Sequence, residues 1–170
     1  GKSFSARYGQ QILVVIWGIG AVLFIGMGAI QYLFCKRRYL KHAVVCTDEQ
    51  VITLWQKSCS KKAPEIQICE QISSPMLMGY GKTVLLLPNT AYSEQELLMM
   101  FRHEAMHEQK KDLWYKLFLS MVCDLYWFNP LYRYMKKLAF QDVEYVCDEL
   151  VTRNMNKEER YSYGQIILKT

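Results

Sequence analysis

The first 42 residues contain no aspartate or glutamate, although they carry six lysines and arginines. The remaining residues hold 15 basic and 16 acidic side chains, so the formal net charge of +5 arises at the N-terminal end alone. A nucleic-acid-binding protein usually carries a basic stripe along its folded body, and this chain lacks one. We therefore predict no direct contact with nucleic acid. Hydrophobic residues make up 51% and charged residues 22%, which excludes a disordered chain.

The chain also lacks any Cys-x-x-Cys pair, although it contains six cysteines. A zinc site built from four cysteines is therefore not indicated. In a reducing compartment we expect all six to remain thiols, mostly as small residues of the core. No internal repeat is present, and a length of 170 residues suits one domain.

Charge is absent from Tyr8 to Cys35, a stretch of 28 residues. Its apolar run, Ile12–Phe34, would span roughly 34 Å as a helix, compared with about 30 Å for the hydrocarbon core of a bilayer. The run is longer than the core of a signal peptide, and no small-x-small cleavage site follows it. We therefore predict one transmembrane helix over residues 8–35, which contacts the lipid bilayer.

A cluster of positive charge, CKRRYLK, follows this stretch directly. Basic residues at a membrane exit mark the cytoplasmic side. We therefore expect residues 36–170 to form a cytoplasmic domain attached to the cell membrane. The chain begins with glycine and ends within a helical pattern, so we interpret it as part of a longer protein.

The first part of this domain shows one helical pattern and several short strands. Asp48–Lys62 has helical spacing, with acids in its first turn and lysines in its last. Glu65–Ile72 alternates like a half-buried strand. Pro75–Gly79 and Thr83–Leu87 are short apolar runs around a Tyr-Gly-Lys turn, which predicts a hairpin.

Four helices are predicted after the hairpin. Ser93 and Glu96 form a capping box that starts the first of them. The order of elements lacks the strand–helix alternation of a doubly wound sheet, so we predict an α+β fold: one transmembrane helix, then a compact domain with a small sheet and several helices. The four helices are expected from Ser93, over 113–126, over 131–150 and from Asn156.

The segment HEAMH lies inside the helix that starts at Ser93. His103 and His107 are four residues apart, so both imidazoles project from one side of the helix and can meet one zinc ion. Glu104 is then placed to act on a water molecule at the metal. The alternative is a pair of surface histidines on an amphipathic helix.

A third metal ligand is sought among the carboxylates, because a catalytic zinc usually takes three protein ligands. Glu144 and Asp148 lie on one face of a later helix, 37 residues or more beyond His107. Glu144 would bind the metal, and Asp148 would accept the N–H of a ligating histidine. Alternatively, these residues and Glu149 form a solvated acidic face.

Residues 113–134 are rich in aromatic side chains. Lysine, aspartate and arginine interrupt the segment, so it is too broken to span a membrane. The aromatic residues suit either a membrane interface or the core of a small zinc domain. They are Trp114, Tyr115, Phe118, Tyr126, Trp127, Phe128, Tyr132 and Tyr134.

Four segments occur in an order typical of a known family: SSPMLMGYGKTVLLLP, RHEAMHEQKKDLWYK, WFNPLYRYMKK and DVEYVCDELV. They resemble the cytoplasmic metallopeptidase domain of the bacterial beta-lactam-responsive antirepressor receptors, the Bla/Mec sensor-transducer type. The resemblance covers most of residues 36–170 and implies a compact gluzincin fold. It also implies Zn²⁺ held by His103, His107 and Glu144, with Glu104 as the base and Asp148 behind a ligand.

Gluzincins are similar in laying an extended peptide along an edge strand beside the catalytic helix, where main-chain hydrogen bonds give most of the affinity. The matching strand here is the first strand of the hairpin, with Met76, Leu77 and Met78 as substrate-binding residues. Pro75 and Pro88 limit pairing beyond the hairpin, as edge strands often require. The alternative is that both strands lie inside the sheet.

Two functions follow from these patterns. The first is a membrane-anchored zinc endopeptidase that cleaves a cytoplasmic polypeptide, such as a transcriptional repressor or itself, as a signal-transducing antirepressor. Its oxyanion donor is not selected by the sequence among Arg102, Tyr161 and Tyr163. The second is a non-enzymatic signalling scaffold with a structural zinc and a cytoplasmic partner. A structural site needs four protein ligands, and the sequence offers three good ones, which favours the peptidase.

Overall fold

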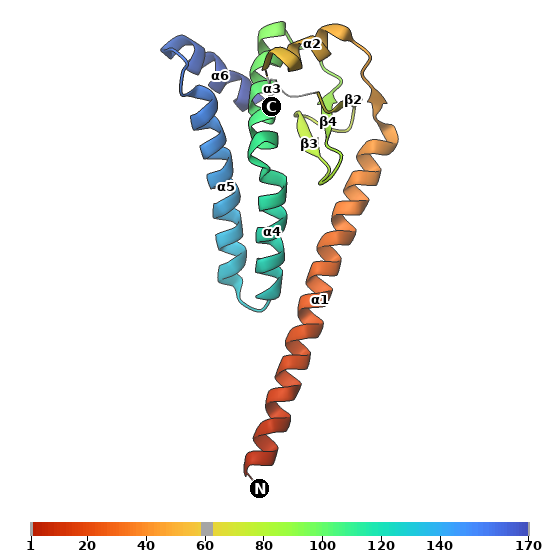
Figure 1. Cartoon of the computed structure of the whole chain (residues 1–170), viewed down its shortest axis with the longest axis vertical. Helices are drawn as coiled ribbons and strands as arrows, with labels where there is room; N and C mark the ends of the chain where they lie inside the picture. Colours follow the sequence, from red (N-terminus) through yellow and green to blue (C-terminus); the bar gives the residue numbers. More distant parts are fainter. Residues whose placement is uncertain (1, 59–62, 170) are drawn as a thin grey trace.

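The computed structural model describes residues 2–58 and 63–169 (Figure 1). Helix α1 (Lys2–His42) has 41 residues, and its N-terminal part extends beyond every other element (Figure 1). The part Arg7–His42 is long and apolar enough to cross a membrane, and most of its apolar side chains are exposed. The stretch predicted to be transmembrane therefore lies within one unbroken helix.

A four-stranded sheet has the order β1 (Val44–Val45), β2 (Glu65–Cys69), β4 (Val84–Pro88), β3 (Met76–Met78). Strands β2 and β4 are parallel, and the two outer strands pair antiparallel. The predicted hairpin is confirmed as β3 and β4. Strand β3 lies at the edge and β4 inside, so the interpretation with both strands inside the sheet is wrong. The predicted strand 65–72 ends early, because the chain turns after Cys69.

The main core lies between this sheet and two helices, α2 (Glu49–Ser58) and α3 (Glu94–Lys110). Trp55 and Phe101 are fully buried and pack edge to face, with ring centroids 5.4 Å apart. Leu85 of β4 belongs to the same cluster. The predicted end of the first helix falls in residues 59–62, outside the described residues. The five described cysteines are free thiols, as predicted, and Cys59 lies outside the described residues.

All four helices predicted after the hairpin are present. The capping box of Ser93 and Glu96 starts α3, which ends at Lys111 with a left-handed backbone, φ 59°. Asn129 caps the third of these helices through its side chain. The remaining helices are α4 (Asp112–Leu125), α5 (Pro130–Thr152) and α6 (Lys157–Lys169). Figure 1 shows α4 and α5 as an antiparallel hairpin beside α1, and the fold is α+β as predicted.

The aromatic segment 113–134 does not form a core. Six of its eight aromatic side chains are exposed, and Phe118 exposes 66% of its surface. The interpretation as an aromatic core is therefore wrong. The six exposed side chains instead lie on the outside of the α4–α5 hairpin.

Candidate metal and active site

Helix α3 presents His103 and His107 on the face that turns toward α5. The capping box fixes where the helix begins, and the spacing of four residues places the two imidazoles one above the other. Their Nε2 atoms lie 3.1 Å apart. Both side chains are largely buried, with 13% and 11% exposed.

Helix α5 adds a carboxylate to the same point. Glu144 Oε2 lies 3.2 Å from His107 Nε2 and 3.6 Å from His103 Nε2. Tetrahedral ligands at about 2.0–2.1 Å from a zinc ion are themselves roughly 3.3–3.4 Å apart. The three atoms therefore form a triangle of the size that one such ion requires. As predicted, one helix, a turn and a returning helix bring Glu144 back to the two histidines.

The outer nitrogen of each imidazole has its own hydrogen-bond partner. His107 Nδ1 lies 2.7 Å from Asp112 Oδ2, and His103 Nδ1 lies 2.8 Å from Tyr163 Oη. Tyr163 donates its O–H to Asp148 Oδ1 at 2.6 Å, and this oxygen is also 3.2 Å from His103 Nδ1. Both imidazoles can thus carry a proton on Nδ1 and direct the Nε2 lone pair inward, as a metal ligand requires.

The electrostatics of the cluster favour a cation among these donors. Burial lowers the pKa of each imidazole, but hydrogen bonds with Cys147 and Glu144 outweigh it, raising the pKa of His103 to about 10 and of His107 to about 11. Hydrogen bonds from both imidazoles hold the pKa of the Glu144 carboxyl well below its usual range. Positive charge is needed here, and a divalent ion would supply it in place of two protons.

Cys147 offers a different third donor. Its sulfur, with one nitrogen of each histidine, forms a group of possible metal ligands. However, Sγ lies 3.6 Å from His103 Nδ1, which already contacts Tyr163, and it is also near the His103 carbonyl oxygen. Cys147 therefore lies behind the imidazole, whereas Glu144 faces both Nε2 atoms. We favour Glu144 as the third ligand.

Glu104 lies beside the triangle and is held by the sheet edge. Its carboxylate accepts a hydrogen bond from the backbone N–H of Leu77 in β3. Burial raises the pKa of Glu104 to about 7, against the opposing attraction of the two imidazoles. Its carboxyl is therefore able to exchange a proton near neutral pH.

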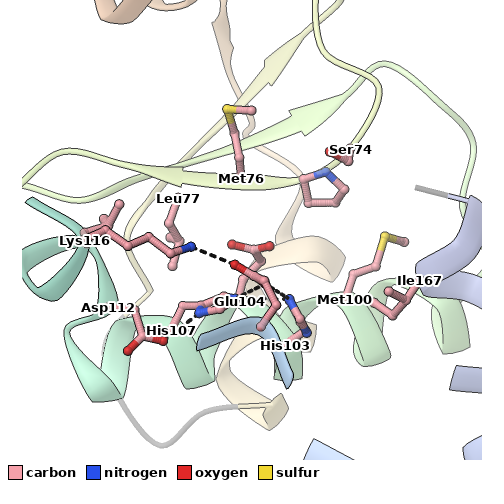
Figure 2. Close-up of a pocket in the computed structure, with 13 residues that line it drawn as sticks. Ser74, Met76, Leu77, Met100, His103, Glu104, His107, Asp112, Lys116 and Ile167 are labelled. Atoms are coloured by element: carbon pink, nitrogen blue, oxygen red, sulfur yellow. Dashed lines mark hydrogen bonds and ion pairs between the residues drawn. The ribbon is translucent and has the colours of Figure 1, made fainter. Parts of the chain in front are cut away.

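A cavity of about 310 Å³ opens over these groups. Figure 2 shows His103, Glu104 and His107 on the helix, with Met76 and Leu77 on the strand across from them. The structure thus directs the side chain of Leu77 to the site, whereas Met76 lines the cavity but points its side chain away from Glu104 and packs against the cluster that contains Met78 (Figure 2). The structure does not bring the side chain of Met78 to the site, because it is buried in this second small cluster behind the sheet.

Lys116 of α4 is a site residue that the sequence reading missed. Its Nζ donates to Glu144 Oε1 at 2.7 Å, which leaves Oε2 facing the histidines. Lys116 also lines the cavity. The three oxyanion candidates do not line it: Tyr163 is buried behind His103, and Arg102 and Tyr161 are exposed.

Asp112 and Tyr163 were not predicted as partners of the histidines. Asp112 comes five residues after His107, at the start of the next helix, and the left-handed Lys111 lets the chain fold back. That spacing was the available signal for Asp112. Tyr163 reaches the site only because α6 crosses α3, which no local pattern reports.

Comparison with known proteins identifies the family of this chain. The family described as BlaR1 peptidase M56 matches residues 2–170, and the chain belongs to this family. It is similar to Regulatory protein BlaR1 of Bacillus licheniformis, with 31% identity over 125 residues, 72% of this chain and 20% of the relative. It is also similar to Methicillin resistance mecR1 protein of Staphylococcus aureus, with 30% identity over 112 residues, 64% of this chain and 19% of the relative.

A longer match reaches Regulatory protein BlaR1 of Staphylococcus aureus, with 26% identity over 168 residues, 94% of this chain and 28% of the relative. The chain therefore spans only about a fifth to just over a quarter of the length of these curated relatives. The resemblance to the Bla/Mec sensor-transducer family is confirmed.

Proposed function

We propose that this member of the BlaR1 peptidase M56 family is a zinc-dependent endopeptidase, anchored in the cell membrane by α1. The observation that carries the proposal is the triangle of His103 Nε2, His107 Nε2 and Glu144 Oε2, with Glu104 beside it and a cavity in front. In this proposal residues 8–35 cross the membrane and residues 36–170 form the catalytic domain. The basic cluster after the helix supports a cytoplasmic position for that domain.

The chain's own residues would carry out most of the reaction. Zinc held by the three ligands would polarise the scissile carbonyl and acidify water. Glu104, with its pKa near neutrality, is placed to accept a proton from that water and to deliver it to the leaving amine. Lys116 lines the cavity as a cation and holds Glu144 in place through Oε1. Asp148, Tyr163 and Asp112 fix the imidazole rings.

The edge strand β3 supports a polypeptide substrate. Residues of a strand direct their backbone groups alternately to its two sides. Leu77 donates to Glu104, away from β4, so the backbone groups of Met76 and Met78 face β4 in the hairpin. An extended substrate would then lie along the outer side of β3 and donate a hydrogen bond to the carbonyl oxygen of Leu77, whose N–H is held by Glu104, while the Leu77 side chain contacts it.

The substrate would be a protein on the cytoplasmic side, a transcriptional repressor or the protein itself. The names of the relatives, a regulatory protein and a methicillin resistance protein, support a role in signalling. Cleavage of a repressor would make the chain an antirepressor.

The alternative, a signalling scaffold with a structural zinc, requires a fourth protein ligand. Cys147 is a further possible donor among the described residues, but it lies on the Nδ1 side of His103. The cavity lined by His103, His107, Glu144 and Glu104 would leave room for a water or substrate at a metal held by the three ligands, which favours catalysis.

The test is Glu104→Gln, with Glu149→Gln as the matched control, because Glu149 is exposed on α5 outside the cavity. Cleavage of synthetic peptides and of the protein itself is followed by mass spectrometry, and zinc by elemental analysis. We expect Glu104→Gln to lower cleavage by about 100- to 10,000-fold, since a general base contributes that much, with one zinc per chain retained. Normal cleavage by the zinc-loaded Glu104→Gln protein would contradict the mechanism.

A further inference from the structure

The tip of the α4–α5 hairpin is fastened to the middle of α1. Trp17 Nε1 donates to the carbonyl oxygen of Leu125 at 2.8 Å, and Trp127 Nε1 donates to the carbonyl oxygen of Trp17 at 3.3 Å. The rings of Phe24 and Trp127 stack with centroids 5.7 Å apart. A Cβ at Gly20 would overlap the Trp127 ring, so glycine permits this close approach. The tip of the hairpin therefore contacts α1, and α4 packs beside it (Figure 1).

These contacts fix how deep the hairpin would reach in a membrane. Trp17 precedes Phe34, the end of the apolar run, by 17 residues, or about 26 Å of helix. At the base of the hairpin, the centroid of the Trp114 ring lies 5.6 Å from that of Tyr80, whose own centroid lies 4.8 Å from that of Tyr32 with the rings tilted by 40°. If α1 crosses a hydrocarbon core of roughly 30 Å, the hairpin begins near its cytoplasmic boundary and ends deep inside it.

The outer surface of the hairpin has the composition that such a position requires. Residues 117–132 contain one charged side chain, Asp124, which faces α1 at Gly28. The guanidinium of Arg133 lies over the ring of Phe24, also on the side of α1. Apart from Arg133 and Lys137, the exposed positions between 117 and 138 carry apolar or aromatic side chains, among them Phe118, Met121, Leu125, Phe128, Leu131 and Leu138.

The basic residues of the hairpin gather in a separate place. Lys116, Arg133, Lys136 and Lys137 line a groove between α4 and α5 that ends at Glu144. Their long side chains can reach toward water while their stems stay apolar. The four basic side chains thus share one groove, and α4, which carries exposed apolar side chains, packs against α1.

We propose that the α4–α5 hairpin is inserted in the bilayer beside α1, with its exposed apolar side chains against lipid acyl chains. The proposal rests on the membrane anchoring in the proposed function. It goes beyond that function, because it places the cavity and its ligands at the cytoplasmic surface of the membrane. The site would then receive a polypeptide segment that lies close to that surface.

The test uses spin labels in the full-length protein reconstituted into phospholipid vesicles, with Cys35 and Cys59 replaced by serine. Single labels are placed at Phe118→Cys and Phe128→Cys on the hairpin, at Leu23→Cys on α1 and at Tyr161→Cys on α6. Leu23 and Tyr161 are both highly exposed, with 64% and 71% of their surface accessible. Collisions with oxygen report lipid, and collisions with a water-soluble nickel complex report water. We expect labels 118 and 128 to behave like label 23, with high oxygen and low nickel accessibility, and unlike label 161.

Zinc content confirms that each labelled protein is folded, and Met121→Cys replaces any hairpin variant that loses zinc. Nickel accessibility at 118 and 128 like that at 161, with label 23 in lipid, would overturn the insertion and leave the proposed function intact. Low accessibility to both reagents would show that protein, not lipid, covers the hairpin, and would also overturn it. High nickel accessibility at label 23 would contradict the proposed anchoring of α1 in the membrane.

Discussion

The body of the domain and its helical hairpin are built in opposite ways. In the body, the sheet, α2 and α3 bury their large side chains, and Trp55, Leu85 and Phe101 are fully buried. In the hairpin, Cys123 is the only buried apolar side chain between Leu113 and Phe140. Burial of a large apolar side chain contributes roughly 1.5–3 kcal/mol, so the body can be stable in water by itself. The stability of the hairpin depends on the surroundings of its exposed apolar side chains.

The candidate site lies where these two regions meet. The body supplies His103 and His107 from α3, and the returning helix of the hairpin supplies Glu144. Lys116 at the base of the hairpin holds the other oxygen of Glu144. A metal ion in the triangle would therefore join two regions that are otherwise stabilised separately.

The largest expected difference between the regions is in the free energy of unfolding lost by Phe101→Ala and by Phe118→Ala. Phe101 is fully buried against Trp55, so its truncation leaves a cavity and should lower the free energy of unfolding by about 3–5 kcal/mol. Phe118 exposes 66% of its surface, so Phe118→Ala should change the free energy of unfolding by about 0.5 kcal/mol or less in detergent solution. Denaturant titration of the solubilised protein, followed by circular dichroism, measures both values. Equal losses in the two variants would show that the hairpin has a protein core of its own.

Removal of the metal should separate the two regions. A ligand at 100 to 1,000 times its Kd stabilises the folded state by about 2.7–4.1 kcal/mol, and a chelator removes that contribution. Amide hydrogen exchange should increase around Glu144 in α5 more than in α2, because α5 supplies a ligand in the proposed site and α2 supplies none. Adding zinc back should restore the protection. An equal increase in α2 would mean that the metal stabilises the domain as a whole.

The body was the easier region to predict from sequence. Its capping box, its hairpin and the spacing of His103 and His107 are local patterns, and each was found at the predicted place. Strand β1 was missed, because two residues, Val44 and Val45, are too few to show a period. The pairing of β2 with β4 is parallel and joins strands distant in sequence, so no turn signal reports it.

The hairpin region was predicted only in outline. Its helices follow from periodicity. Periodicity did not show whether the aromatic side chains face a protein core or the outside of the hairpin, because the same apolar pattern suits either surrounding. Lys116 and Tyr163 could not be assigned to the site, since each depends on how one helix crosses another. Glu144 was reached because its helix returns toward α3 after a short turn.

The smallest expected effect is a loss of zinc affinity from a substitution in α6, which packs behind His103. Tyr163→Phe removes the hydroxyl that lies 2.8 Å from His103 Nδ1 and donates to Asp148. Asp148 Oδ1 is itself only 3.2 Å from that nitrogen, so it can replace the lost partner. We therefore expect zinc affinity to fall by about tenfold, the lower end of the range for such partners. Competition with a chromogenic chelator measures the affinity, and Tyr161→Phe is the matched control because its side chain is 71% exposed on the same helix. Unchanged affinity in Tyr163→Phe would show that Asp148 alone orients His103, whereas an equal loss in both variants would mean that α6 acts through packing.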